Sequence, residues 1–163
     1  GGWQLSGLYR QASGLPTSVG NGRFWPTNWN ITGYATATGA FQDGTNKDAP
    51  APPGGRGGVN IFQDPAAASR AFSFTAPGQS GGRNIVRGDG NFNIDLGLGK
   101  RFTMPYSEQH TLQFRWEVFN VTNSTRFDPL SATADLSNLG SFGRYTDTLS
   151  LPRIMQFALR YEW

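Results

Sequence analysis

Few side chains of this sequence have the type and spacing that chemistry at a site requires. His110 is the single histidine and there is no cysteine, so a transition metal would need further ligands from distant parts of the chain. Asp95 and Glu117 could act as a carboxylate pair in acid–base catalysis only if they converged, and we expect them to lie beside Arg101 and Arg115 instead. We therefore predict no catalytic residue, no metal site and no cofactor, and we expect that the protein is not an enzyme.

Two short motifs resemble binding loops but fit local structure better. Residues 97–100 are GLGK, which lacks the spacing of a phosphate-binding loop. They lie inside a predicted strand, where Gly97 and Gly99 would leave open space. Residues 87–90 are RGDG, in which Asp-Gly is first a turn signal. Neither motif predicts a ligand site.

The charge of the chain is modest and scattered. The 163 residues carry a formal net charge of +3, which comes mostly from arginine, with 12 Arg against 2 Lys. Nucleic-acid binding needs basic residues clustered on one face, so we expect no nucleic-acid partner. No apolar run approaches the ~18 residues that a membrane-spanning helix requires.

Four stretches of the sequence alternate between apolar and polar residues with a period of two, which is typical of strands with one apolar face. They predict strands at about residues 2–13, 90–104, 109–121 and 153–163. The third stretch shows the pattern most clearly. Its apolar positions Leu112, Phe114, Trp116 and Val118 alternate with Gln113, Arg115 and Glu117. A slip of one residue would exchange the two faces, so the pairing register must be firmly set.

The connections between these strands are very unequal in length. The second and third strands are joined by PYSE at residues 105–108, a tight turn, whereas residues 14–87 and 122–152 form two long loops. The first loop is rich in glycine and proline, a composition typical of irregular structure. An Asp-Pro pair followed by alanines predicts one short helix within it, near residues 65–71.

If the strands are antiparallel, both long loops fall at one end and the tight turn at the other. Long strands with this asymmetry, apolar outward and polar inward, describe an outer-membrane β-barrel. Aromatic residues gather at the short-turn end, as they do at a membrane interface; they are Trp3, Phe102, Tyr106, Tyr161 and Trp163. We therefore predict an all-β fold, in which residues 1–163 form an antiparallel transmembrane β-barrel segment. The segment would supply the last four strands and two long extracellular loops, and would be incomplete on its own.

The barrel interpretation assigns the strand side chains to lipid or to the lumen. The residues expected to face lipid are Leu112, Phe114, Trp116, Val118, Phe157 and Leu159. The residues expected to face the lumen are Asp95, Arg101, Arg115, Glu117 and Arg160. Two alternatives stay open: a soluble, secreted all-β module with a structural or adhesive role, and a homo-oligomeric barrel to which each chain lends four strands. The second is disfavoured because the long loops would be repeated around the mouth of the barrel.

The first long loop contains many aromatic residues for a polar segment. They are Phe24, Trp25, Trp29, Tyr34, Phe41, Phe62, Phe72 and Phe74. One interpretation is a ligand-catching surface, with Trp25, Trp29 and Tyr34 as possible ligand contacts. The other, which we favour, is that the aromatics pack the loop onto itself and onto neighbouring loops.

Five segments of the chain, taken in order, carry a resemblance to a known family. They are GGWQLSGLYRQASGLP, GRNIVRGDGNFNIDLGLGKRF, LQFRWEVFNVTN, Phe142–Gly143 and LPRIMQFALRYEW. Together they resemble the C-terminal end of TonB-dependent outer-membrane receptors, and most of all the Oar-like group with a carboxypeptidase-regulatory-like domain. The resemblance covers nearly the whole chain and is weakest across residues 21–75. Gly88-Asp89-Gly90 stands where similar proteins usually have Gly-Pro-Gly, a departure that affects only a loop turn.

The resemblance implies energised uptake of a bulky nutrient across the bacterial outer membrane. This segment would form barrel wall, extracellular loops and the C-terminal assembly signal. In that signal Gln156 would be the polar position, Ala158 would stand where glycine is usual, and Tyr161 and Trp163 would be the apolar pair. The implied partners are the rest of the barrel and its plug domain, the barrel assembly machinery, the TonB complex and outer-membrane lipid. The plug, the energy-coupling box and the signal peptide would all precede Gly1.

Overall fold

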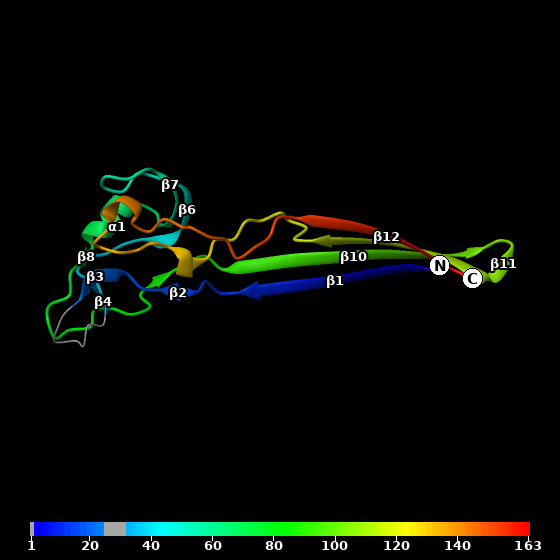
Figure 1. The fold of residues 1–163 in the computed structure, drawn as a ribbon, viewed down its shortest axis with the longest axis horizontal. Helices are drawn as coiled ribbons and strands as arrows, with labels where there is room; N and C mark the ends of the chain where they lie inside the picture. The colour runs from blue at the N-terminus through cyan, green and yellow to red at the C-terminus, as the bar shows by residue number, and fades with distance from the viewer. Residues whose placement is uncertain (1, 25–31) are drawn as a thin grey trace. The chain divides into compact units, whose positions relative to one another are not determined.

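A computed structural model of the protein describes residues 2–24 and 32–163 (Figure 1). Contacts along the backbone divide the chain into two compact units. The strand unit contains the described residues up to Ala12, together with Asn91–Thr125 and Ser150–Trp163. The loop unit contains the described residues of Ser13–Gly90 and Arg126–Leu149. The predicted strands thus fall in one unit, and most of the two predicted loops fall in the other.

The strand unit is one antiparallel sheet in the order β1-β10-β11-β12. Its strands are β1 (Trp3–Ala12), β10 (Asn91–Met104), β11 (Ser107–Phe119) and β12 (Ile154–Glu162). They lie where the alternation predicts them, and no end differs by more than two residues. Leu98 pairs with Leu5 on one side and with Trp116 on the other. The register therefore sets apolar positions of neighbouring strands side by side.

The sheet is open, as expected for an incomplete barrel. Strands β10 and β11 each have a neighbour on both sides, whereas β1 and β12 form the two edges (Figure 1). All ten residues of β1 are exposed, and so are eight of the nine residues of β12. Backbone N–H and C=O groups at such an edge can pair with a further strand. Both edges of this sheet are long enough to continue a barrel wall.

The turn between β10 and β11 is tighter than predicted. Only Pro105 and Tyr106 form it, because β11 already begins at Ser107. The pairing register shifts between Thr103 and Met104, just before the turn. Such an irregularity bends a strand locally and helps it to reverse direction. Pro105 has no backbone N–H to donate and so suits a position outside the hydrogen-bonded ladder.

The loop unit contains short regular elements between irregular stretches, so the prediction of irregular structure over residues 14–87 is right only in part. Four pairs of antiparallel strands form within it, β2 with β9, β3 with β4, β5 with β8 and β6 with β7. The bounds are β2 (Pro16–Thr17), β3 (Gly20–Phe24), β4 (Thr32–Tyr34), β5 (Thr36–Ala37), β6 (Asp43–Ala49), β7 (Gly58–Phe62), β8 (Phe72–Ser73) and β9 (Val86–Arg87). Its second segment contains the 3-10 helices η2 (Pro129–Ser131) and η3 (Leu139–Ser141). Most of these strands are too short to show a period of two in the sequence.

The single short helix predicted in the loop unit is confirmed. Helix α1 spans Pro65–Arg70 and begins after Asp64, whose carboxylate accepts hydrogen bonds from the backbone N–H groups of Ala66 and Ala67. This is the usual cap of a helix N-terminus, and Pro65 suits the first helical position because it lacks an N–H. Among the residues that the structure describes, no helix is long and apolar enough to cross a membrane.

A hydrophobic core holds the loop unit together, and both of its chain segments, the described residues of Ser13–Gly90 and Arg126–Leu149, contribute to it. Its centre consists of four phenylalanines, Phe41, Phe62 and Phe72 from the first segment and Phe142 from the second. The rings of Phe62 and Phe142 stack with centroids 5.2 Å apart and planes at 9°, and both side chains are fully buried. For Phe41, Phe62 and Phe72 the favoured prediction, that loop aromatics pack the loops together, is confirmed.

Phe142 and Gly143 are the point at which the second segment joins this core. The carbonyl of Phe142 accepts a hydrogen bond of 2.8 Å from Asn60 Nδ2, and the carbonyl of Gly143 accepts one of 2.9 Å from the Ile61 N–H. Gly143 has a φ of +74°, and a Cβ there would lie 2.3 Å from Asn60 Oδ1 and 2.5 Å from a ring carbon of Phe62. Glycine suits this position because it adopts the left-handed backbone conformation readily and because there is no room for a Cβ atom.

Replacing Phe142 with alanine should destabilise the loop unit by roughly 3–5 kcal/mol, the usual cost of truncating a buried phenylalanine. In the full-length protein, hydrogen exchange measured by mass spectrometry should show faster exchange at Ile61, whose N–H is held by the second segment. Phe74→Ala is the matched control, because Phe74 lies in the same unit but is 40% exposed. Equal exchange rates in the two variants would show that Phe142 does not anchor the second segment.

Candidate functional site

One face of the four-stranded sheet, the apolar face, is built from every second residue of each strand. Its side chains include Trp3, Leu5 and Tyr9 of β1, Ile94, Leu96, Leu98, Lys100 and Phe102 of β10, Leu112, Phe114, Trp116 and Val118 of β11, and Met155, Phe157, Leu159 and Tyr161 of β12. All six residues predicted to face lipid lie on it. The rings of Trp116 and Phe157 stack across the β11–β12 pair, with centroids 6.2 Å apart and planes at 11°.

Most of the apolar face is open to its surroundings. The exposed fraction is 75% for Leu5 and 68% for Phe157. Val118 differs from its prediction, because it is only 4% exposed and lies between the larger side chains of its register partners Leu96 and Met155. Contiguous apolar surface of this extent is rare on soluble monomers and marks contact with a membrane or a protein.

The opposite side of the sheet, the polar face, carries charges of both signs in pairs. Arg101 lies 2.8 Å and Arg160 lies 3.1 Å from the carboxylate of Glu162, and Arg115 forms an ion pair with Glu117. These residues include four of the five predicted to face the lumen. Each exposed pair adds little stability in water. Arg101 and Arg160 share Glu162, so the ion pairs neutralise part of the charge on a face that is suited to water rather than to hydrocarbon.

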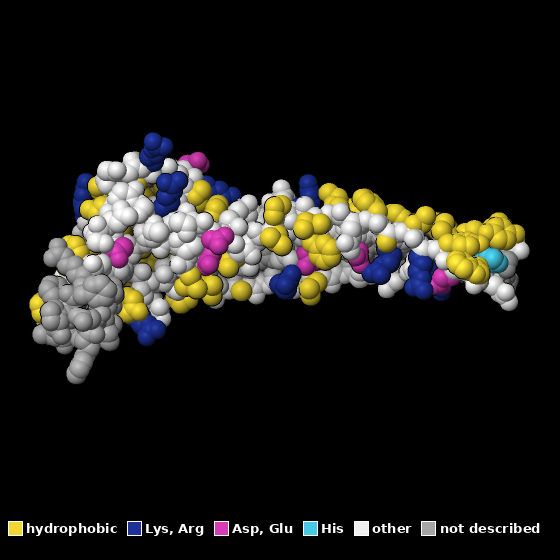
Figure 2. Space-filling model, viewed as in Figure 1, with side chains coloured by type: hydrophobic (Ala, Val, Ile, Leu, Met, Phe, Trp, Pro, Cys, Tyr) yellow, Lys and Arg dark blue, Asp and Glu magenta, His cyan; other side chains and the backbone are white. Residues whose placement is uncertain are grey.

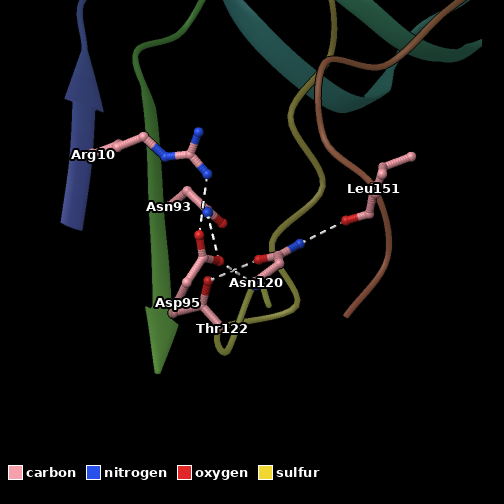
Figure 3. Close-up of polar contacts among 6 residues, drawn as sticks. All are labelled: Arg10, Asn93, Asp95, Asn120, Thr122 and Leu151. Atoms are coloured by element: carbon pink, nitrogen blue, oxygen red, sulfur yellow. Dashed lines mark hydrogen bonds and ion pairs between the residues drawn. The ribbon is translucent and has the colours of Figure 1, made fainter. Parts of the chain in front are cut away.

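Asp95, the fifth predicted lumen residue, is also on the polar face but has a different partner from the one expected. Arg101 follows it by six residues on the same strand, and six residues of strand span about 20 Å. Arg10 of the neighbouring strand β1 instead donates from Nη2 to Asp95 Oδ2 at 3.1 Å (Figure 3). Asn93 Nδ2 donates to the other carboxylate oxygen at 2.8 Å. Cross-strand register decides the ion pair, and proximity in sequence does not.

A network around Asn120 joins Asp95 to the end of β11. The Asn120 N–H donates to Asp95 Oδ1 at 2.9 Å, and Asn120 Nδ2 donates to the Leu151 carbonyl at 2.8 Å (Figure 3). Asn120 Oδ1 accepts from the Ser124 N–H at 3.2 Å, and Asn120 is only 7% exposed. This one side chain therefore ties the end of β11 to the segment that leads into β12.

Asn123 completes the same turn. It has a left-handed φ of 49°, as Asn120 does with 53°, and its Oδ1 accepts from the Arg153 N–H at 3.0 Å. Our sequence-based site prediction missed both asparagines. The signal was the segment Asn-Val-Thr-Asn directly after the alternating pattern, because asparagine tolerates the left-handed region and hydrogen-bonds nearby backbone. Strand β11 ends at Phe119, before the predicted residue 121, because Asn120 leaves the extended conformation.

Two glycines open a shallow hollow in the middle of the polar face. Gly97 and Gly99 line it together with Gln4, Ser6, Gln113, Arg115 and Glu117, and its volume is about 210 Å³. A Cβ at Gly97 would lie 2.7 Å from Ser6 Oγ, so even alanine would require a shift there. The glycines leave space beside the strand, as the sequence predicts.

Aromatic side chains cluster at the end of the sheet that carries the Pro105–Tyr106 turn. The hydroxyl oxygens of Tyr106 and Tyr161 lie 3.0 Å apart, and His110 Nδ1 lies 2.6 Å from Tyr161 Oη. Figure 2 shows hydrophobic side chains gathered around the histidine at this end. Within residues 2–24 and 32–163, no three His, Asp or Glu side chains are placed to hold a metal ion. His110 thus contributes to an aromatic cluster.

The possible ligand contacts in the first long loop are only partly described. Trp25 and Trp29 lie outside the described residues. Tyr34 ends β4, where its N–H donates to the Ser80 carbonyl at 3.2 Å and its carbonyl accepts from the Thr75 hydroxyl. These backbone contacts explain the position of Tyr34 in the loop unit without a ligand.

The sequence matches the protein-family model "Outer membrane beta barrel domain" over residues 1–156, from before β1 into β12. No curated protein and no solved structure matches the chain significantly. The matched family, the antiparallel strands and the two-faced sheet all agree with the predicted barrel segment, so the soluble secreted module is not retained. The chain belongs to the outer membrane beta barrel domain family, and its location is the bacterial outer membrane.

Proposed function

We propose that the chain is part of a TonB-dependent outer-membrane receptor, similar to the Oar-like group, that takes up a bulky nutrient. One combination carries the proposal: long strands with an exposed apolar face, and two long connections that leave the same end of these strands and share one core. Long loops in compact proteins are usually functional, and loops on a rigid scaffold commonly carry binding sites. A receptor that captures a bulky ligand before transport needs such a folded surface.

In this role the two faces of the sheet have different neighbours. The apolar face contacts lipid, and the polar face lines the lumen, as in outer-membrane barrels generally. The edges of β1 and β12 pair with other strands of the barrel, and a plug domain elsewhere in the protein occupies the lumen. The segment has a structural and recognition role, without catalysis, and energy reaches the receptor through TonB.

We also propose that β12 is the strand that the barrel assembly machinery recognises. It is an exposed edge strand with Tyr161 and Trp163 stacked at one end, their centroids 6.0 Å apart. Gln156 lies on its polar face, hydrogen-bonded to Glu117, and Ala158 pairs with Arg115. Because apolar and polar residues alternate along β12 and aromatic residues lie at its end, the strand presents one apolar face to the machinery.

The TonB assignment predicts a direct interaction of the full-length receptor. A purified full-length protein should capture the periplasmic domain of TonB, because the energy-coupling box of this family lies in the N-terminal region. Residues 1–163 alone should capture none, and they provide the control for unspecific adhesion. Capture by neither protein would place the barrel in another transport class, while the outer-membrane fold would stand.

The two faces should be separable by labelling in the membrane. Single cysteines in place of Leu112, Phe114 and Trp116, in a cysteine-free full-length protein, should react with a lipid-dissolved thiol probe. Cysteines in place of Gln113 and Glu117 should react instead with a water-soluble probe. The readout is the labelled fraction at each position.

Cysteine at Val118 is an internal control, because this apolar position is 4% exposed and should label weakly with either probe. If positions 112, 114 and 116 are shielded from the lipid probe as a protein core would be, the apolar face does not contact lipid.

Assembly should depend on Tyr161 near the end of β12 and on Trp163 directly after it. Replacing both Tyr161 and Trp163 with alanine in the full-length protein should lower the amount of heat-modifiable barrel in outer-membrane fractions several-fold. Trp3→Ala is the matched control, because Trp3 is an aromatic of the same face and the same end, 65% exposed, on the other edge strand. An equal loss in both variants would mean that aromatic anchoring in general, and not recognition of β12, limits assembly.

A further inference from the structure

The polar face carries large apolar side chains near the end of the sheet at which β10 begins. Leu8 of β1 pairs with Asp95, and Phe119 of β11 pairs with Ile154 of β12. All three apolar side chains are open to their surroundings, with exposed fractions of 53% for Leu8, 43% for Phe119 and 49% for Ile154. Water in a lumen gains nothing from such side chains, so their grouping indicates contact with an apolar group.

Leu8 and Phe119 are opposite walls of a second hollow on this face. The hollow has a volume of about 280 Å³, and its lining also includes Ser6, Asp95, Gly97 and Glu117. Gly97 lies between Ser6 and Glu117 in the register and has no side chain to fill the space between them. The floor of the hollow is therefore backbone, which a ligand can approach closely.

The carboxylate of Asp95 is held at the edge of this hollow. Its donors Arg10 and Asn93 pair with each other one strand position before the Leu8–Asp95 level (Figure 3). Both hydrogen bonds draw the carboxylate toward the start of β10 and away from Gly97. The network around Asp95 thus keeps the space between Leu8 and Phe119 open.

The second hollow continues into the shallow hollow described above, and we call the two together the β10 groove. Ser6, Gly97 and Glu117 line both hollows. Because neighbouring strands lie about 5 Å apart, side chains of β1 and β11 form two walls about 10 Å apart over β10. The groove is apolar at Leu8 and Phe119 and becomes polar further along. Its polar part is lined by side chains that include Gln4 and Gln113.

The charged side chains along the β10 groove are already paired. Asp95 forms an ion pair with Arg10, and Arg115 forms one with Glu117. An anionic ligand would have to draw Arg115 away from Glu117, and a cationic ligand would compete with Arg10 for Asp95. A neutral ligand leaves both ion pairs intact. It can also use side-chain amides, which donate and accept hydrogen bonds without a net charge.

We propose that the β10 groove binds the transported solute, and that this solute is a neutral molecule with an apolar ring next to hydrogen-bonding groups. The ring lies between Leu8 and Phe119, over the backbone of Gly97. The hydrogen-bonding groups extend toward Gln4 and Gln113. Apolar walls with a few polar groups are the usual composition of small-molecule sites. The inference rests on the proposed function, in which the polar face lines the lumen of a transporter.

Binding of para-nitrophenyl glucoside tests the proposal, because this probe joins one ring to a neutral, hydroxyl-rich group. Saturation-transfer NMR on the full-length protein in lipid nanodiscs gives its dissociation constant. Leu8→Asn and Phe119→Asn should each weaken binding about tenfold, the order expected when one apolar contact is lost. Phe119→Leu should retain binding, because an apolar side chain remains. Ile154→Asn is the matched control and should bind normally, because Ile154 lies on the same face but one strand further from the groove.

Four outcomes would overturn the proposal. The first is that the wild type does not bind the glucoside. The second is that Leu8→Asn and Phe119→Asn bind as the wild type does, and the third is that Ile154→Asn weakens binding equally. The fourth is that para-nitrophenyl phosphate binds as tightly as the glucoside, because the groove would then not select a neutral ligand.

A second measurement covers the case in which the asparagine variants fail to fold. In the wild type, the ring protons of the glucoside should receive more saturation than its sugar protons, and the reverse would overturn the proposal. The photoreactive residue benzoylphenylalanine in place of Phe119 should crosslink to the glucoside on irradiation. Crosslinks only to another part of the same protein, whether or not the glucoside is present, would assign the groove to contact with a plug and overturn the proposal.

The solute site and the coupling to TonB fail separately. A failure of TonB capture would leave binding of the glucoside unchanged, since the β10 groove lies wholly within the strand unit. A failure of glucoside binding would leave TonB capture unchanged.

Discussion

The backbone hydrogen bond in hydrocarbon is the interaction on which this structure depends. A strand in lipid must satisfy its N–H and C=O groups with neighbouring strands, because no water is present to do so. Once antiparallel neighbours are in register, the side chains alternate between the two faces of the sheet because the extended backbone is pleated. Strands β10 and β11 satisfy this condition on both sides. The apolar face, the polar face and the cross-strand ion pairs are consequences of that pairing.

The sequence predicts those parts of the fold that depend on a local repeat or a local cap. The alternation predicts β11 because every second residue of the strand, as at Leu112, Phe114 and Trp116, faces the same surroundings. The sequence also predicts α1, because its cap residue Asp64 lies within three residues of the N–H groups that it accepts from. The short strands of the loop unit are set by contacts far apart in sequence, as when Thr36 pairs with Ser73. Too few residues lie in each strand for a period to emerge, so the composition predicts irregular structure where short strands surround a core.

The candidate site divides in the same way. Membership of a face follows from alternation, and the predicted lumen residues all lie on the polar face. The ion-pair partners on that face depend on the pairing register of the strands, which the sequence alone does not reveal. Asp95 therefore pairs with Arg10 of β1 and not with Arg101. The turn at Asn120 is intermediate. Its residue type carries the left-handed preference, but the bonds to Asp95 and Leu151 that give it a role appear only when three segments come together.

The shared core of the loop unit also sets an order of events in folding. Phe62 and Phe142 stack, yet the whole β10–β11 hairpin, residues 91–119, lies between them in the chain. Contacts that close over so long a separation form late, because the entropy of loop closure must be overcome first. The hairpin can form from local contacts alone and brings its two flanking segments back to one end. A hairpin that forms first shortens the effective separation between Asn60 and Gly143, so we expect the core of the loop unit to close after the β10–β11 hairpin has formed.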